Sequence, residues 1–217
     1  MSKERLRTEQ LAAAQKVILE GPFSSLHSVK TVTGLNIHYG GGKELRAAAV
    51  TVGFPDLAII ETRRHKAPPL SRLSGESVDR EEHELDLLIK TIQSLSRQPD
   101  IFICHAHGIA HPLRAGLASL LGVVLKRTVI GCAQKLAHGQ CDEPPPGVKG
   151  AYQYIRDING DVLGMSLRTR PFCAPVFVSP GHLIDVETAG DIVLACCKRS
   201  RLPEPLRLAA SKAKELL

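Results

Sequence analysis

The stretch from residue 99 to residue 134 constrains the fold more than any other part of the chain. It begins with a short apolar run at 101–104, continues through a polar turn that contains glycine, and passes by a small-residue helix into a second apolar run. This order is typical of two parallel strands joined by a crossover helix. Because such strands are buried on both faces and ligands bind beyond their carboxyl ends, we expect a functional site at His105, His107 and Gly108.

Three further strands are expected before this unit. The alternating, β-branched segment 28–39 is followed by a glycine-rich turn, by segment 45–52 and, after a Pro-Asp turn, by segment 57–62. Short strands separated by such turns predict an antiparallel meander. Residues 63–78 are polar and rich in proline, serine and glycine, which favours an exposed connection.

The remaining elements follow from periodicity. Helical spacing or alternation predicts helices at 2–19, 79–95, 185–197 and 205–217, and strands at 151–157, 162–169 and 175–178. Three antiparallel strands, a helix and then a parallel crossover predict an α/β fold with a mixed central sheet flanked by helices. The length of 217 residues suits one domain, residues 1–217.

Composition bears on partners and on location. The net charge of +6 and the pI near 9.1 favour a polyanionic partner through phosphate contacts. The absence of tryptophan and the aromatic content of 4% argue against recognition by extensive base stacking. The first residues lack the apolar core of a secretory signal, and no stretch approaches about 18 uninterrupted apolar residues, so we expect a cytoplasmic protein with no membrane partner. The oligomeric state stays open.

Two clusters of basic residues are candidates for contacts with phosphates. Solvated surface charge is the alternative interpretation of both. The clusters are Arg63, Arg64, Lys66 and Arg72, and Lys198, Arg199 and Arg201.

Three motifs resemble the endonuclease V family: the stretch 99–134, Ser-Pro-Gly-His at 179–182 and Arg-Leu-Pro-Glu-Pro at 201–205. The resemblance extends from about Lys30 to Leu208. It implies a ribonuclease H-like fold and a nuclease that uses magnesium to cut a DNA or RNA strand near a deaminated adenine, that is, at inosine.

The resemblance also implies a metal site formed by an Asp, a Glu and a second Asp. Matching the motifs places Asn36, Glu84 and His105 at these catalytic, metal-binding positions, with Glu81 and Glu82 as alternatives to Glu84. Magnesium prefers carboxylate oxygens, so the loss of two carboxylates is expected to weaken its binding severely.

Other catalytic and substrate positions are implied as well. Gln134 replaces the family's active-site lysine, His182 matches a histidine of the family's active site, and residues 73–76 do not match its base-displacing wedge. The amides of the turn after His105 are expected to bind an anion, with close packing as the alternative role of its glycines. The predicted substrate-binding residues are His38, Ala106, His107, Gly108, His111, Gly116, Ser179 and Gly181.

The histidines leave the cofactor open. On an alternating strand Asn36 and His38 face the same side, so His38, His105, His182 and Glu84 form a hypothetical zinc or manganese site. Magnesium or manganese follows from the resemblance, and a metal-free acid–base site is the third alternative.

Three functions therefore stay open. The first is an endonuclease V-type nuclease that acts near inosine with an altered metal site. The second is an inactive homologue that binds nucleic acid or a protein partner. The third is an enzyme with non-nuclease chemistry at a histidine-rich cleft.

Overall fold

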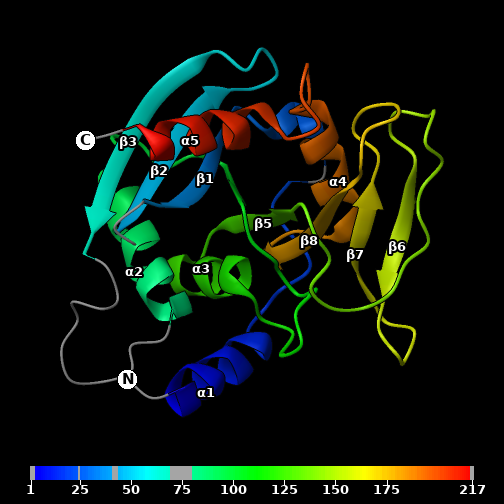
Figure 1. Ribbon diagram of the computed structural model, residues 1–217, viewed down its shortest axis with the longest axis horizontal. Coiled ribbons are helices and arrows are strands. Elements are labelled where there is room, and N and C mark those ends of the chain that lie inside the picture. The colour runs from blue at the N-terminus through cyan, green and yellow to red at the C-terminus, as the bar shows by residue number, and fades with distance from the viewer. Residues whose placement is uncertain (1–2, 24, 41–43, 69–79, 216–217) are drawn as a thin grey trace.

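The computed structural model is built around one eight-stranded sheet with the order β3-β2-β1-β4-β5-β8-β7-β6 (Figure 1). It describes residues 3–23, 25–40, 44–68 and 80–215. The strands are β1 (Thr31–Tyr39), β2 (Leu45–Gly53), β3 (Ile59–Ala67), β4 (Ile101–Cys104), β5 (Thr128–Ala133), β6 (Tyr152–Arg156), β7 (Val162–Leu167) and β8 (Val176–His182). The neighbours β1–β4 and β4–β5 are parallel and the other neighbours are antiparallel, which confirms the predicted mixed sheet.

Helices cover both faces of this sheet. They are α1 (Lys3–Ala14), α2 (Arg80–Gln93), α3 (Leu117–Leu125), α4 (Val186–Ala195) and α5 (Glu204–Lys214), with a short 3-10 turn, η1 (Leu26–Ser28). Phe102 of β4 belongs to the core packed by α2 and α3, whereas its neighbour Ile103 belongs to the core packed by α4 and α5. Burial on both faces explains why β4 is apolar at every position.

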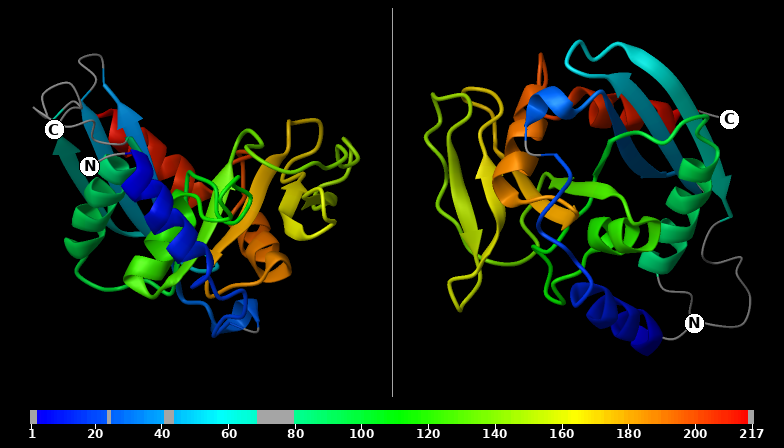
Figure 2. Two further views of the ribbon diagram at one scale, coloured as in Figure 1. Left: turned by 90° about the horizontal axis from the view of Figure 1, so that it is seen from below. Right: turned by 180° about the vertical axis from the view of Figure 1, so that it is seen from behind.

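The N-terminal segment lies across the outside of one core. α1 lies beside α3, and the segment after it runs past the end of β8 towards η1 (Figure 2). Leu183 N–H donates to the Ile18 carbonyl at 2.7 Å, which fixes this crossing. The predicted helix 2–19 therefore ends earlier, at Ala14.

Two predicted boundaries were wrong. Strand β3 continues to Ala67, so Arg63, Arg64 and Lys66 lie on an edge strand and not in a connection. An edge strand tolerates charged side chains because one of its sides is open to solvent. Strand β8 includes Ser179–His182, where Ser179 pairs with Gly131 of β5.

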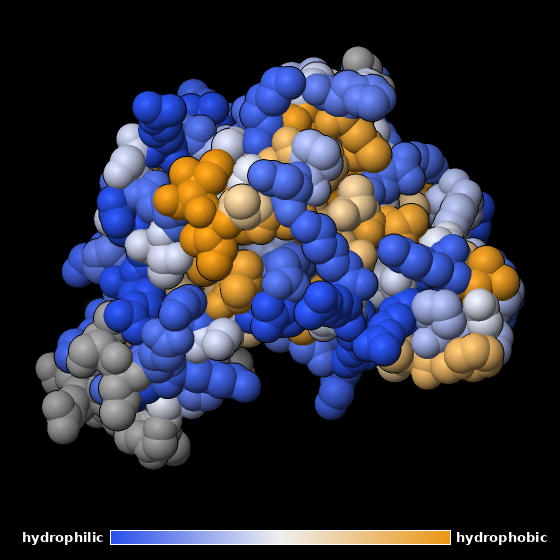
Figure 3. Space-filling view, turned by 90° about the horizontal axis from the view of Figure 1, so that it is seen from above, coloured by the Kyte–Doolittle hydropathy of each residue, from blue (hydrophilic) through white to orange (hydrophobic). Residues whose placement is uncertain are grey.

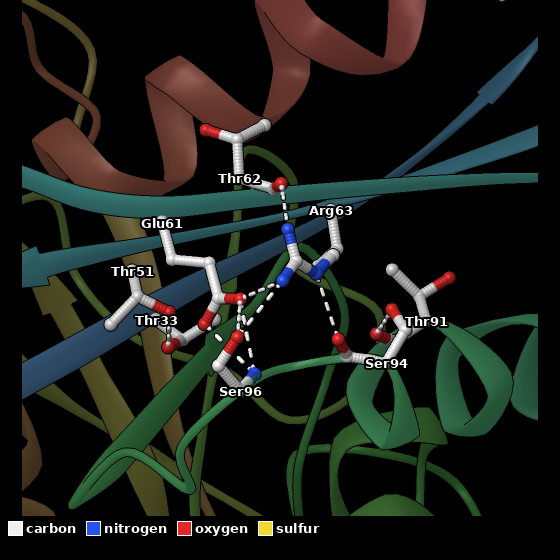
Figure 4. A network of polar contacts seen from close by, with 8 residues as sticks. All are labelled: Thr33, Thr51, Glu61, Thr62, Arg63, Thr91, Ser94 and Ser96. Carbon is white, nitrogen blue, oxygen red and sulfur yellow. Dashed lines mark hydrogen bonds and ion pairs between the residues drawn. The ribbon is translucent and has the colours of Figure 1, made fainter.

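Edge strand β3 is tied to the loop after α2 by a polar network (Figure 4). Arg63 Nε donates to the Ser94 carbonyl at 2.7 Å, and its Nη2 donates to Ser96 Oγ at 2.9 Å. Glu61 forms an ion pair with Arg63 at 2.5 Å and accepts the Ser96 N–H at 3.0 Å. Arg63 thus has a structural role here, and Arg64 pairs with Glu215 at 3.1 Å. Arg72 lies outside the described residues.

The surface mixes polar and apolar side chains. The face seen from above shows apolar patches interrupted by hydrophilic residues (Figure 3). Exposed large apolar residues include Leu11, Ile60 and Val124, which belong to three different elements. No helix in the described ranges is long and apolar enough to cross a membrane.

Gly34→Ala is expected to destabilise the fold by about 3 kcal/mol, because the close approach of α5 to β1 leaves no room for a side chain. A Cβ at Gly34 would lie 2.2 Å from the Pro205 carbonyl carbon, a backbone atom that moves only with α5. Gly147→Ala is the matched control, since the nearest atom to its added Cβ is Phe172 Cζ at 3.6 Å. Urea unfolding measures both, and equal midpoints would contradict the prediction.

Candidate functional site

Asn36 and His105 lie side by side at the carboxyl edge of the sheet. Leu35 pairs with Cys104 in the parallel register of β1 and β4. The residues that follow them, Asn36 and His105, are therefore neighbours. Asn36 Nδ2 lies 3.1 Å from His105 Nδ1. An amide nitrogen can only donate, so Nδ1 accepts and the neutral ring carries its proton on Nε2. Burial lowers the pKa of His105, which favours this neutral form.

Glu84 reaches the same edge from α2. It accepts a hydrogen bond from the Tyr39 hydroxyl, a residue that the sequence prediction missed. Alternation places Tyr39 on the side of β1 shared by Leu35 and Ile37, opposite to Asn36, so the pattern used to predict the site did not lead to Tyr39. A hollow of about 270 Å³, here called the first hollow, is lined by Leu35, Ile37, Tyr39, Glu84, Leu88, Cys104, His105 and Leu117.

A second hollow adjoins the first and shares Glu84, His105 and Leu117 with it. Its other lining residues are Glu81, Ala106, His107, His111 and Gly116. Glu81 accepts from Gln10 Nε2 at 2.6 Å and lies 3.9 Å from His111 Nε2. Of the three glutamates considered from the sequence, Glu84 alone lines both hollows, and Glu82 lines neither.

The turn after His105 uses its glycines and amides for packing. Gly108 N–H donates to Ser179 Oγ at 2.8 Å, and Ile109 N–H donates to the Pro180 carbonyl at 2.9 Å. A Cβ at Gly108 would lie 1.9 Å from the Pro180 carbonyl oxygen. Gly116 N–H donates to the Gly108 carbonyl at 3.0 Å. The amides of Gly108, Ile109 and Gly116 thus have acceptors within the protein, which supports the close-packing role for these glycines.

Ser179 and Gly181 serve the same packing from β8. Ser179 is buried and accepts the Gly108 N–H. A Cβ at Gly181 would lie 2.7 Å from the Val129 carbonyl oxygen. Neither residue lines the two hollows.

His182 does not join the other predicted site residues. It pairs with Val129 of β5, which in turn pairs with Phe102 of β4. His182 therefore lies level with Phe102, three residues or about 10 Å before His105 along the strand direction. His182 is only 5% exposed, and its Nδ1 accepts the Ile18 N–H at 3.2 Å.

Gln134 and His38 are near the carboxyl edge but outside both hollows. Gln134 follows β5 directly, and its Oε1 accepts from Arg201 Nη2 at 2.6 Å. His38 lies opposite Arg46 of β2. Neither side chain contacts Glu84 or His105 through a hydrogen bond described by the structure.

The described residues do not fit a divalent metal. Among the described residues, no group of three or more His, Cys, Asp or Glu side chains is arranged to hold an ion, so the predicted zinc or manganese set is not formed. Asn36 and His105 hydrogen-bond to each other, and Glu84 alone supplies a carboxylate to the predicted three-residue site. Magnesium needs several hard oxygen ligands, which this set does not provide.

The pKa values of the histidines lining the second hollow are all lowered, which favours their neutral forms. Burial, followed by the neighbouring His111 and His105, lowers the pKa of His107 to about 4. Burial, followed by His138, also lowers the pKa of His111. The hollow therefore offers uncharged imidazole donors and acceptors next to two glutamates.

Acid is expected to destabilise the fold between pH 7 and pH 5, and His107→Asn is expected to remove part of this loss. Unfolded His107 titrates near 6.5 and folded His107 near 4, so between these values the unfolded chain binds more protons. Stability therefore falls as the pH drops below 6.5. The expected contribution is about 1 kcal/mol once solvent screening is allowed for.

Urea unfolding at the two pH values measures this contribution. The control is His27→Asn, at an exposed histidine on η1, which should leave the loss unchanged. An equal loss of stability in wild type and His107→Asn would contradict the assignment.

The parallel crossover, the antiparallel meander and a polar cleft at the carboxyl edge define a ribonuclease H-like protein. The sequence pattern of the Endonuclease V family matches residues 11–211. The chain therefore belongs to the endonuclease V family, a family of nucleic-acid-cleaving proteins.

Individual relatives agree with this membership. Endonuclease V of Roseiflexus sp. (strain RS-1) is 42% identical over 188 residues, which cover 85% of this chain and 81% of the relative. The crystal structure of endonuclease V from Streptomyces avermitilis is similar with a TM-score of 0.86 at 28% identity, covering 98% of this chain and 92% of that one. Ciona intestinalis endonuclease V, in complex with a 24mer DNA that contains an inosine followed by a ribo-adenosine, has a TM-score of 0.75 at 25% identity, with coverages of 97% and 95%.

Proposed function

We propose that this chain binds inosine-containing nucleic-acid strands at the carboxyl edge of its sheet and has lost most magnesium-dependent cleavage. The observation that carries the proposal is the hydrogen bond between Asn36 and His105 at 3.1 Å. It occupies the two positions at which the family resemblance implies metal-binding aspartates. A neutral amide and a neutral imidazole replace two negative charges there.

The expected loss of cleavage follows from what a divalent cation supplies. It polarises the phosphate and lowers the pKa of an attacking water, and it does so only if carboxylates hold it in place. Glu84 is the one carboxylate among the three implied ligands, and Tyr39 already donates to it. In this chain Gln134, tied to Arg201, replaces the lysine implied near the phosphate.

Nucleic-acid binding is supported by the fold and by the net charge of this chain. The Ciona relative was crystallised with inosine-containing DNA. This chain has a similar fold, and its own net charge is +6. Phosphate contacts from a basic protein give affinity that falls steeply with salt.

A second candidate function is metal-free acid–base chemistry. The second hollow brings His105, His107 and His111 together with Glu84, and imidazoles with a lowered pKa are unprotonated at pH 7, so that they can accept a proton from an attacking group. Cleavage that persists in EDTA and is lost in His107→Asn would favour this candidate.

One experiment tests the proposal directly. Inosine-containing DNA and RNA strands are incubated with the protein in magnesium, manganese or EDTA, and binding and cleavage are read from the same samples. We expect binding that weakens as salt rises, with little cleavage in any buffer. Rapid cleavage in magnesium that Glu84→Gln abolishes would contradict the proposed loss, and no binding to any strand would contradict the proposed ligand.

A further inference from the structure

A tight turn at residues 170–173, here called the aromatic turn, joins β7 to β8 and exposes a phenylalanine. Cys173 N–H donates to the Arg170 carbonyl at 3.4 Å and closes the turn. Pro171 is its second residue and Phe172 its third. Phe172 is 83% exposed and has a φ of 56°, a left-handed conformation that favours glycine at the third position of a turn. A strained, exposed aromatic residue of this kind points to a function outside the fold itself.

The packed neighbours of the aromatic turn hold the Phe172 ring in place. Phe172 N–H donates to the Pro146 carbonyl at 2.6 Å. The buried Arg168 donates to the Cys173 carbonyl from beneath the turn. A Cβ at Gly147 would lie 3.6 Å from Phe172 Cζ and 3.9 Å from Phe172 Cε1, so one side of the ring rests on Gly147. The remainder of the ring is open to solvent and is positioned before any ligand binds.

Cations lie next to this ring. Arg170 Nη1 donates to the Arg199 carbonyl at 2.8 Å, which joins the aromatic turn to the loop between α4 and α5. That loop and the start of α5 form a hollow of about 520 Å³, here called the basic hollow, lined by Lys198, Arg199, Ser200, Glu204 and Arg207. Glu204 is the one carboxylate in this lining and pairs with Arg207 at 2.5 Å. The excess positive charge of Lys198 and Arg199 suits a phosphate group.

Arg201 connects the aromatic turn to the carboxyl edge of the sheet. Its Nη1 donates to the Ala174 carbonyl at 3.3 Å, and its Nη2 donates to Gln134, which directly follows β5. Because β5 is the neighbour of β4, the aromatic turn lies along the same edge as His105. Phe172 lines neither of the two hollows there. A strand bound at the cleft can therefore extend along this edge to the basic hollow and the aromatic turn.

We propose that the open side of Phe172 stacks on an unpaired base of a bound strand, outside the cleft, while the basic hollow holds an adjoining phosphate. Stacking on an aromatic ring tolerates any sequence, because every base has a π-face. Bases within a duplex already stack on their neighbours, so the ring favours single strands and does not select inosine. The adjacent cations match the phosphates of a strand, whereas an apolar protein surface would leave them unpaired. This inference rests on the proposed nucleic-acid binding and adds a preference for single strands to it.

Replacing Phe172 tests the stacking directly. Phe172→Gly is expected to weaken the binding of a single-stranded, inosine-containing DNA about tenfold in EDTA. Binding of the same strand annealed to its complement should change by less than about twofold. Phe172→Trp keeps an aromatic surface and should bind the single strand at least as tightly as wild type. Fluorescence anisotropy at fixed salt gives the dissociation constants.

Abasic sites placed one at a time on either side of the inosine locate the stacked base. We expect one position at which the abasic site weakens wild-type binding about tenfold and leaves the binding of Phe172→Gly unchanged. Arg199→Gln, in contrast, should weaken the binding of every strand alike. It should also reduce the slope of log affinity against log salt by about 0.7, the value for one phosphate contact on a single strand.

Stability separates a ligand-binding role of the ring from a structural one. Phe172→Gly should unfold in urea at a midpoint no lower than that of wild type, because glycine relaxes the left-handed backbone. Ile158→Gly is the matched control, since it makes the same type of exchange at a residue that is 95% exposed, at the other end of β7. This control should leave the affinity for the single strand unchanged.

The outcomes distinguish this inference from the proposed function. Binding of wild type to none of the strands overturns the proposed function. Equal affinities of wild type and Phe172→Gly for the single strand overturn the inference and leave strand binding in place. A loss in Phe172→Gly that no abasic position abolishes, or that accompanies a lower urea midpoint, also overturns the inference, because the ring then acts on the fold or the sugar-phosphate backbone.

Discussion

Replacing Asn36 and His105 together by aspartate is expected to raise magnesium-dependent cleavage of inosine-containing strands by at least about tenfold. The two positions are adjacent, with Asn36 inside β1 and His105 directly after β4, and their side chains already meet at 3.1 Å. Two carboxylates there, with Glu84 from α2, would provide the hard oxygen ligands that magnesium requires. Cleavage at several magnesium concentrations measures the gain, and calorimetry measures the binding of the ion.

Controls for this variant separate metal binding from a general effect of charge. Adding Glu84→Gln to the double variant should remove the gained cleavage. Asn36→Ser with His105→Ser breaks the same hydrogen bond without adding carboxylates and should give no gain. Absence of cleavage in a folded double variant that binds magnesium would point to Gln134, and Gln134→Lys in that background is the next variant.

Arg168→Met is expected to lower the free energy of unfolding by about 3 kcal/mol, because it removes donors from buried backbone acceptors. Arg168 is only 2% exposed and is among the largest fully buried side chains of the described residues. Its Nη2 donates to the Pro144 carbonyl at 2.6 Å and to Glu143 at 2.8 Å, and its Nη1 donates to the Cys173 carbonyl. One side chain thus holds two loops together beside β7.

The matched control is Arg170→Met, two residues further along the same segment. Arg170 is exposed and donates only to the Arg199 carbonyl, at 2.8 Å, so its loss should cost less than about 0.5 kcal/mol. Urea unfolding of both variants gives the comparison. Similar midpoints for Arg168→Met and wild type would show that the buried guanidinium is not stabilising.

The sequence by itself determined the order of strands and helices, the crossover 99–134 and the family. These follow from periodicity, turn residues and short motifs, all of which are local features of the sequence. The resemblance to the family also implied that Asn36, Glu84 and His105 share one site, and the structure places Asn36 Nδ2 3.1 Å from His105 Nδ1. The sequence did not predict that β3 continues to Ala67, because edge pairing lets charged residues extend a strand.

Only the tertiary structure decided which predicted residues meet. The register of β8 places His182 about 10 Å from His105 along the strand direction. No local sequence pattern predicts that register. The amides of Gly108 and Ile109 donate to Ser179 and Pro180 of β8, about seventy residues away along the chain. Tyr39 reached Glu84, and Asn36 fixed the His105 ring, through contacts between distant segments. Packing across the sheet brings these side chains together, whereas the sequence identifies only which residues are candidates for the site.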